Sequence, residues 1–311
     1  MVLVVRDEAE KIATHLTYHH ALGVDRAWVF VDRSGDATAE LADAFPWVTV
    51  IRRDRTPEER FLSTFQTGCM ARGLELARAE GWRWLLHLDP DEFACGHSPA
   101  SLRRWLRPLD RHPERHGGLG RLLERVAPGT EMVVLAPNDV LPTPRAPGAP
   151  FHHLVFTLRR GAVARPMLDP VSGEVRRLDR PLGHDKGKAL VRTEAPVEPA
   201  SAHRWRPTDG RRELRTEHRG FHFHYVVTDG EGWWRKYRRL AEYPAHWDSG
   251  HPVSFPKQTF KEAARTMGRD EAVAWFDRWL LWRRRDLLPA LATGKVVYDP
   301  FVRQVVEGAG S

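Results

Sequence analysis

The residues whose types and spacing could do chemistry are gathered in the acidic segment Asp89–Phe93, which reads Asp-Pro-Asp-Glu-Phe. It directly follows the apolar run Trp84–Leu88, which we predict to be a buried strand. Two aspartates one residue apart can offer oxygens to a single hard cation, so Mg²⁺ or Mn²⁺ is the expected ion. Because such an ion keeps positions open for phosphate oxygens, the segment favours chemistry on a nucleoside diphosphate or a phosphate ester. The alternative is a solvated acidic turn.

Short apolar runs alternate with segments of helical period through the first ninety residues. Helices are expected around residues 12–22, before Phe45, and over 57–80. This alternation predicts an α/β fold with a mostly parallel sheet and helices on both faces. Ligands bind such sheets outside the carboxyl ends of the strands, where the acidic segment lies. The predicted strands are Val2–Val5, Ala27–Val31, Val48–Ile51 and Trp84–Leu88.

The second half of the chain shows a different order of elements. A helix is expected from Ser98 to Leu106, and the segments 107–120 and 137–150 have the composition of loops. Short extended segments then indicate a mixed continuation of the sheet, and the chain turns helical from Gly230 onward. The extended segments are Glu131–Ala136, Leu154–Arg159, Ala189–Arg192 and Phe221–Val227, and the helices are Glu231–Glu242, Lys257–Thr266 and Asp270–Leu288.

Composition sets outer limits on the protein class. With 311 residues, 41% of them hydrophobic and 29% charged, wholesale disorder is excluded, and the length suggests two domains or one large α/β domain with additions. No apolar run is long enough for a membrane span, and two cysteines cannot build a disulfide framework, so we expect a cytoplasmic protein. The net charge of +7 fits nucleic acid, anionic lipid or phosphorylated small molecules without choosing among them.

The acidic segment and its strand resemble the Asp-x-Asp-Glu-Phe motif of GT-A glycosyltransferases related to families 2 and 92. Other motifs of those enzymes follow in the same order over roughly residues 1–240, although segment 137–150 departs from their usual Trp-x-x-Phe-Gly pattern. These motifs are Val5–Ala9, with Asp7 replacing the usual Asn; His19–Asp25; Asp32–Thr38, one residue short; Lys188–Arg192 followed by His203; and His224-Tyr225 followed by Trp233, Lys236 and Tyr237.

The resemblance implies a GT-A fold, which is a Rossmann-like, mostly parallel mixed sheet with helices on both faces, here with a C-terminal helical extension. The expected glycosyltransferase domain is 1–229, divided into a nucleotide-sugar-binding half (1–106) and an acceptor half (107–229), and the extension is 230–311. The resemblance further implies a metal-dependent, inverting transfer of sugar from a nucleotide-sugar, commonly a UDP-sugar, to a hydroxyl of a glycan, lipid-linked or small-molecule acceptor. Polysaccharide or glycoconjugate assembly is the expected setting.

The metal site implied by the resemblance consists of Asp91, with Asp89 acting directly or through ribose and water. A distant histidine completes it in related folds, and we nominate His224, with His222 as the second choice. Strand alternation in this segment places both imidazoles on one face. A structural histidine satisfied by hydrogen bonds is an equal alternative for His224.

Nucleoside recognition is assigned by the resemblance to Asp32 and to the turn Arg6–Glu8, which includes Asp7. Asp32 could instead cap its own loop. Lys188 and Arg192 lie four apart in a predicted strand and can face one side, where they could meet diphosphate oxygens; a solvated basic strand is the alternative.

Inversion requires a carboxylate base to take the proton of the acceptor. Glu92 and Asp139 are the two candidates, ranked equally. Glu92 could instead support the metal site, and Asp139 could be a turn residue.

The apolar spacing of Ala272, Trp275, Phe276, Trp279 and Trp282 is better explained by a docked helix face than by a platform for sugar rings. The run 283–285 (Arg-Arg-Arg) could touch anionic lipid heads at the inner membrane face if the acceptor is membrane-borne, but a solvated helix end is the default.

Two other classes of protein compete with this interpretation. A phosphatase or phosphotransferase of haloacid-dehalogenase type also places Asp-x-Asp after a buried strand, but normally after the first strand and followed by Thr or Val. A non-enzymatic nucleic-acid binder is suggested by charge and aromatic content, yet basic residues are spread along the chain and no recognised motif is present. We therefore expect no nucleic-acid partner.

Overall fold

The structure is a computed structural model that describes residues 1–56, 59, 61–96, 118–144, 155–157, 165–178, 186–244 and 256–309. Within these residues, eight strands form one mixed sheet in the order β3-β2-β1-β4-β10-β6-β13-β5. The strands are β1 Val2–Val5, β2 Ala27–Val31, β3 Val48–Arg52, β4 Trp84–Leu88, β5 Glu92–Cys95, β6 Met132–Asp139, β10 Lys188–Arg192 and β13 Thr216–His224.

Strands β1 to β4 run parallel, as the alternating pattern predicted. β10 is antiparallel to both β4 and β6, so β6 points the same way as β4, and β13 pairs parallel with β6. β5 closes the order antiparallel to β13. The carboxyl ends of β1, β2, β4, β6 and β13 and the first residues of β5 and β10 therefore share one edge of the sheet.

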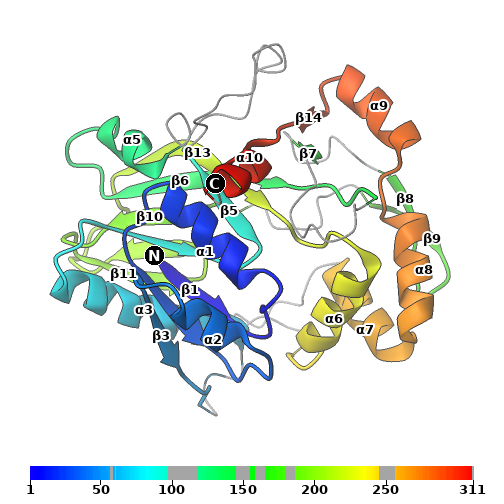
Figure 1. Cartoon of the computed structure of the whole chain (residues 1–311), viewed down its shortest axis with the longest axis horizontal. Helices are drawn as coiled ribbons and strands as arrows, with labels where there is room; N and C mark the ends of the chain where they lie inside the picture. Colours follow the sequence, from blue (N-terminus) through cyan, green and yellow to red (C-terminus); the bar gives the residue numbers. More distant parts are fainter. Residues whose placement is uncertain are drawn as a thin grey trace.

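Helices cover both faces of the sheet, because the central parallel strands β1 and β2 are apolar and buried at every position (Figure 1). Leu3 and Val5 face the core beneath α1, α2, α5 and α10, whereas Val2 and Val4 pack against α3 and the hairpin β11-β12. The helices are α1 Ile12–Ala21, α2 Thr38–Asp43, α3 Leu62–Ala79, α5 Leu119–Glu124 and α10 Phe301–Ala309, and the hairpin strands are β11 Val197–Ser201 and β12 Arg204–Pro207.

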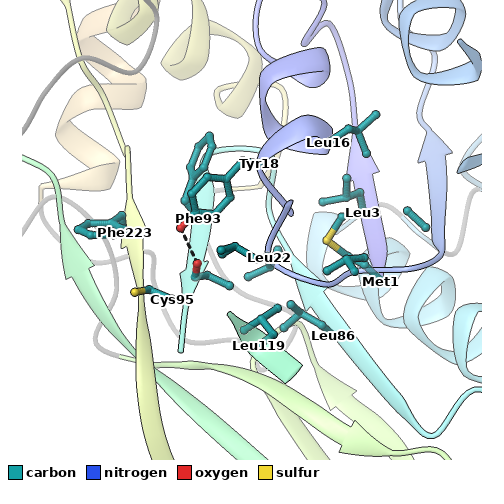
Figure 2. Packing of buried hydrophobic residues seen from close by; sticks show 14 of the residues in the cluster. Met1, Leu3, Leu16, Tyr18, Leu22, Leu86, Phe93, Cys95, Leu119 and Phe223 are labelled. Carbon is teal, nitrogen blue, oxygen red and sulfur yellow. Dashed lines mark hydrogen bonds between the residues drawn. The ribbon is translucent and has the colours of Figure 1, made fainter. Parts of the chain in front are cut away.

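Helix α1 is joined to edge strand β5 by buried aromatic contacts (Figure 2). The hydroxyl of Tyr18 donates to the carbonyl of Ala94 at 2.7 Å, and the Tyr18 ring meets Phe93 edge-on at 5.0 Å. Nε2 of buried His15 lies 2.9 Å from the Glu92 carbonyl, and burial lowers the pKa of His15 to about 4. The last strand of the sheet is thus fixed to the first helix.

The C-terminal helices form their own apolar cluster beside the sheet (Figure 1). Trp233, Phe260 and Trp275 meet in this cluster with ring centroids 5.2–5.8 Å apart. The chain then returns, so that Phe301 of α10 packs against Tyr18 in the main core. The elements are α6 Gly230–Leu240, α7 Lys257–Thr266, α8 Arg269–Trp279, α9 Arg284–Ala292 and β14 Val296–Tyr298, which pairs with β7 Val155–Thr157; hairpin β8-β9 is Arg165–Leu168 and Val175–Leu178.

The predicted α/β class, with a mostly parallel mixed sheet and a C-terminal helical extension, is confirmed. One local prediction is wrong. The single helix expected over 270–288 is broken between α8 and α9, where Arg165 binds the carbonyls of Leu280 and Leu281 and the backbone N–H of Trp282 donates to the Pro142 carbonyl. Glu92 and Phe93 begin strand β5, which the sequence pattern did not predict, because they pair with β13.

The helix expected over 98–106 lies outside the described residues, and β6 runs on to Asp139 inside the segment expected to be a loop. Among the described helices, none combines the length and the apolar character needed to cross a bilayer.

Candidate active site

The acidic segment lies at the shared edge of the sheet, where β4, β5, β6, β10 and β13 all contribute side chains. Asp89 and Asp91 follow β4, while Asp139 and His224 are the last residues of β6 and β13. Lys188 is the first residue of β10, which reaches the same edge because it runs antiparallel. In the ladder, His224 stands opposite both Asp139 and Glu92, so one row of paired residues builds the floor of the site.

Asp89 is held on both carboxylate oxygens. Its Oδ1 accepts a hydrogen bond of 2.8 Å from Gln66 Nε2 of α3, and its Oδ2 lies 2.9 Å from Lys188 Nζ. Burial alone would raise the pKa of Asp89, but the charge of Lys188 outweighs it and lowers the pKa. Asp89 is thus an ionised carboxylate whose position is fixed from two sides.

Glu92 lies beneath the site with its side chain fully buried. Its Oε2 accepts from the Asp89 N–H at 2.8 Å and lies 3.3 Å from Lys188 Nζ, and its Oε1 lies 3.3 Å from His222 Nε2. Glu92 therefore orders the turn that carries both aspartates. This is the supporting role that the sequence analysis gave as the alternative to a catalytic base. His222, the second choice for a metal ligand, belongs to this lower layer.

Asp91 faces the Lys236 ammonium and the His224 ring. Its Oδ2 accepts from Lys236 Nζ of α6 at 2.6 Å, and its Oδ1 lies 3.9 Å from His224 Nε2. Burial would raise the pKa of Asp91, yet Lys236 and His224 lower it. The other ring nitrogen of His224, Nδ1, lies 3.1 Å from Asp139 Oδ1. Burial opposes the charged form of His224, but the hydrogen bond to Asp139 and the charge of Asp91 raise its pKa.

These contacts can be tested for their fit to a divalent ion. Neighbouring ligands of an octahedral Mg²⁺ lie about 3 Å apart, against 3.9 Å between Asp91 Oδ1 and His224 Nε2. With Nδ1–H directed at Asp139, Nε2 is the donor atom and the carboxylate fixes the ring, which is how metal-binding histidines are usually oriented. Across the described ranges, no group of three His, Cys, Asp or Glu side chains is arranged to hold an ion. The types of these two donor atoms suit an ion that takes two ligands from the protein and the others from substrate and water, once Asp91 Oδ1 and His224 Nε2 approach each other from 3.9 Å to about 3 Å.

A cavity of about 310 Å³ opens above this edge. It extends from the end of β1 and the start of α3 to helices α6 and α7, so the C-terminal helices form one wall. Lys257 of α7 lines it, and burial together with the charge of Lys236 lowers the pKa of Lys257. The polar lining residues are Arg6, Glu8, Asp32, Ser63, Gln66, Asp89, Asp91, His203, His224, Lys236, Tyr237, Arg239, Tyr243, Lys257 and Lys261.

The residues expected to bind the nucleoside lie at the β1 and β2 end of the cavity. Asp32, only 2% exposed, is paired with Arg55, whose Nε and Nη2 lie 2.8 and 2.5 Å from Oδ2. Arg6 pairs with Glu242 at 3.0 Å. Glu8 pairs with Arg239 of α6 at 3.2 Å.

Asp7 has a left-handed backbone, with φ 54°, and its Oδ1 accepts from the Gly35 N–H at 2.8 Å. Asp7 lines a neighbouring groove of about 950 Å³ and does not line the cavity. Its role in the structure is to join the turn after β1 to the loop after β2.

The structure does not bring Arg192 to the site. Arg192 is the last residue of β10 and stands opposite Trp84, the first residue of β4, at the far edge of the sheet. Its guanidinium lies 4.5 Å from the Trp84 ring centroid, and its Nε donates to the Thr130 carbonyl at 2.6 Å. The expectation that Lys188 and Arg192 act together on one diphosphate is therefore wrong.

Sequence reasoning gave no role to three residues of the site. Gln66 and Lys257 lie on helices far from the acidic segment in the chain, and no motif marks them. Lys236 belongs to the element that begins with His224-Tyr225, and its place on the first helix after that strand was the available signal.

Comparisons with known proteins give little support to residue roles. No family model and no curated protein matches the chain. Among solved structures, the similar ones include a 4-diphosphocytidyl-2C-methyl-D-erythritol synthase, at 17% identity over 62% of this chain and 73% of that one, with a TM-score of 0.31. A glucosyl-3-phosphoglycerate synthase from Mycobacterium tuberculosis, in complex with Mn²⁺, uridine diphosphate and phosphoglyceric acid, matches at 21% identity over 62% and 55%, with a TM-score of 0.29. A mycobacterial protein matches at 17% identity over 81% and 83%, with a TM-score of 0.34. Because these TM-scores are all below 0.5, the matches assign no role to any residue of this chain.

Proposed function

We propose that the protein is a GT-A-type glycosyltransferase that moves a sugar from a nucleotide-sugar, in the first instance a UDP-sugar, to a hydroxyl acceptor. The observation that supports this best is the row Asp91–His224–Asp139 at the carboxyl ends of the strands, beside a cavity with a lysine wall. Open α/β sheets bind nucleotides at this edge.

In this proposal, Asp91 and His224 hold Mn²⁺ or Mg²⁺, and Asp139 orients His224. The ion would supply Lewis-acid neutralisation of the charge that develops on the leaving diphosphate. Lys236 and Lys257 line the same cavity and would add positive charge near the phosphates.

The remaining residues of the cavity are assigned to the nucleotide. Asp89, fixed by Gln66 and Lys188, presents its carboxylate edge to the ribose. Asp32 and Arg6 lie where the base would enter, between β1, β2 and α6.

Neither Glu92 nor Asp139 lines the cavity. The geometry therefore gives the proposal no general base, and inversion stays a prediction from the resemblance. The same holds for the identity of the acceptor and for any contact with a membrane surface.

The test is release of UDP from a panel of UDP-glucose, UDP-galactose and UDP-N-acetylglucosamine, with Mn²⁺ or Mg²⁺ and with chelator. Asp91→Asn is expected to lower sugar-dependent UDP release by roughly 100-fold or more, because it weakens the proposed ligand of the ion. Asp209→Asn, an exposed aspartate paired with Arg211, is the matched control and is expected to keep the wild-type rate.

Full activity of Asp91→Asn, or no UDP release from any donor, would contradict the proposal. Two parallel assays address the competing classes: hydrolysis of p-nitrophenyl phosphate would favour a phosphatase, and retention on single-stranded DNA or RNA at 0.15 M salt would favour a nucleic-acid binder.

A further inference from the structure

The two aspartates of the acidic segment each have a lysine of their own, and the two lysines differ in accessibility. Lys188 is a strand residue with no exposed side-chain surface, enclosed between Asp89 and Glu92. Lys236 is a helix residue with 26% of its side chain exposed. Its amine lies 2.6 Å from Asp91 and 2.8 Å from the Val226 carbonyl. Lys188 is part of the sheet, whereas Lys236 has room to change partners.

Lys236 also lies between two hollows of the surface. It lines the cavity of about 310 Å³ and the groove of about 950 Å³ on the other side of the turn after β1, and Asp91 lines both as well. The Asp91–Lys236 ion pair therefore borders both hollows, and the Lys236 ammonium is carried on a flexible four-carbon stem.

The charges at Asp91 are balanced without a divalent ion. Asp89 and Asp91 are paired with Lys188 and Lys236, and Lys257 adds a further positive charge to the same cavity. A divalent ion at Asp91 Oδ1 would sit close to the Lys236 ammonium on Oδ2 of the same carboxylate. Like charges so close repel strongly where water is partly excluded. A diphosphate brings the negative charge that both cations then share.

We infer that Lys236 is the counter-ion of Asp91 in the nucleotide-free protein and makes the binding of a divalent ion depend on a diphosphate. When the diphosphate enters, the ammonium exchanges Asp91 for a phosphate oxygen, and the carboxylate becomes a better ligand for the ion. This inference rests on the proposed function. It assigns Lys236 as a positioning residue that couples the two ligands.

The experiment measures Mn²⁺ binding to the full chain by electron paramagnetic resonance of free Mn²⁺, with and without UDP. For the wild type, UDP is expected to tighten Mn²⁺ binding at least tenfold. Lys236→Met is expected to bind Mn²⁺ alone at least tenfold more tightly than the wild type, and the tightening of Mn²⁺ binding by UDP is expected to be smaller than in the wild type by the same factor. Thermodynamic linkage requires the same reduction in the effect of Mn²⁺ on UDP binding, measured by calorimetry.

Three variants make the result specific. Lys236→Gln tests the loss of charge with a side chain that can still hydrogen-bond, and serves if the Met variant does not fold. Lys236→Arg keeps the charge and is expected to keep the dependence on UDP. Arg235→Met removes a charge from the same helix, where the guanidinium pairs with Glu10 at 3.1 Å, and is expected to behave like the wild type.

The inference is overturned if the folded Met and Gln variants bind Mn²⁺ alone no more tightly than the wild type, or if UDP tightens Mn²⁺ binding by as large a factor in them as in the wild type. If the variants give this result while the wild type turns over UDP-sugars, the proposed function is retained and only the role of Lys236 is rejected. Should the wild type bind neither Mn²⁺ nor UDP, both fall together.

Discussion

Removal of the amine of Lys188 directly tests the two ion pairs, with Asp89 and Glu92, that support the acidic segment. The side chains of Lys188 and Glu92 are both fully buried, with Nζ 3.3 Å from Oε2, and the same amine lies 2.9 Å from Asp89 Oδ2. Lys188→Met preserves the apolar stem but leaves the fully buried Glu92 and the partly buried Asp89, 24% exposed, without their shared cation. Breaking a buried ion pair in this way costs about 3–5 kcal/mol of the free energy of unfolding.

The expected loss converts to a melting temperature lower by roughly 6–10 °C, at about 2 °C per kcal/mol for a chain of this size. Differential scanning calorimetry measures it, and Arg72→Met is the matched control. Arg72 pairs with Glu75 at 2.8 Å, but both side chains are more than half exposed, so that loss is expected to stay below about 1 kcal/mol.

The pH dependence gives a second readout for Lys188→Met. In the wild type, Lys188 keeps the pKa of Asp89 below its ordinary value, so the stabilisation is complete above about pH 4 and is lost as the pH falls through the depressed pKa. In the variant, burial without the cation raises the carboxyl pKa, so stability falls as the pH rises through that raised value. The gap in melting temperature should therefore be wider at pH 8 than at pH 5.

A melting temperature within 2 °C of the wild type at pH 8 would refute this reasoning. The double variant Lys188→Met/Glu92→Gln provides an internal check. Because it removes one of the two uncompensated charges, it is expected to be more stable than Lys188→Met alone.

Two further predictions test the orientation of His224 and the crowding at the bulge of β13. Asp139→Asn removes the carboxylate that holds His224, so Mn²⁺ binding in the presence of UDP is expected to weaken by about 10–100-fold in calorimetric titration; an unchanged affinity would rule out the orienting role. Gly220 has φ +68° at the irregularity of β13, and a Cβ there would lie 2.5 Å from the Cys95 carbonyl oxygen. Gly220→Ala is therefore expected to lower the free energy of unfolding, measured in urea, by about 2–4 kcal/mol. Gly294→Ala, with φ +66° and nothing within 4 Å, should cost about 1–2 kcal/mol, and equal losses for both would show that crowding contributes nothing.

The first half of the sheet could be predicted because its strands are mostly apolar runs that alternate with helical segments. Strand β5 could not, since Glu92 and Phe93 follow an Asp-Pro-Asp turn and their partners in β13 lie about 130 residues away. A buried glutamate in a four-residue strand has no local signal. Only its pairing with Lys188 and His222 explains it.

The prediction for Lys188 and Arg192 failed because periodicity identifies the face of a strand on which a residue lies but not the edge of the sheet that it reaches. Residues four apart in a strand do share a face, but they are separated by about 13 Å along it, which is most of the width of this sheet. One residue therefore reaches the carboxyl edge and the other the opposite edge. Strand direction decides which, and direction depends on a partner that the local sequence does not specify.

The sheet order has a geometric consequence for the acidic tripeptide. Three strands separate β4 from β5 in that order, so a flat sheet would hold these two about 19 Å apart. Asp89, Pro90 and Asp91 are the whole connection, and a fully stretched link from Leu88 to Glu92 spans at most about 14 Å. The sheet must therefore curve, so that β4 and β5 come within the reach of this three-residue connection. The place of the two carboxylates in space is then set by the curvature of the entire sheet, and a change of twist in a distant strand would move them.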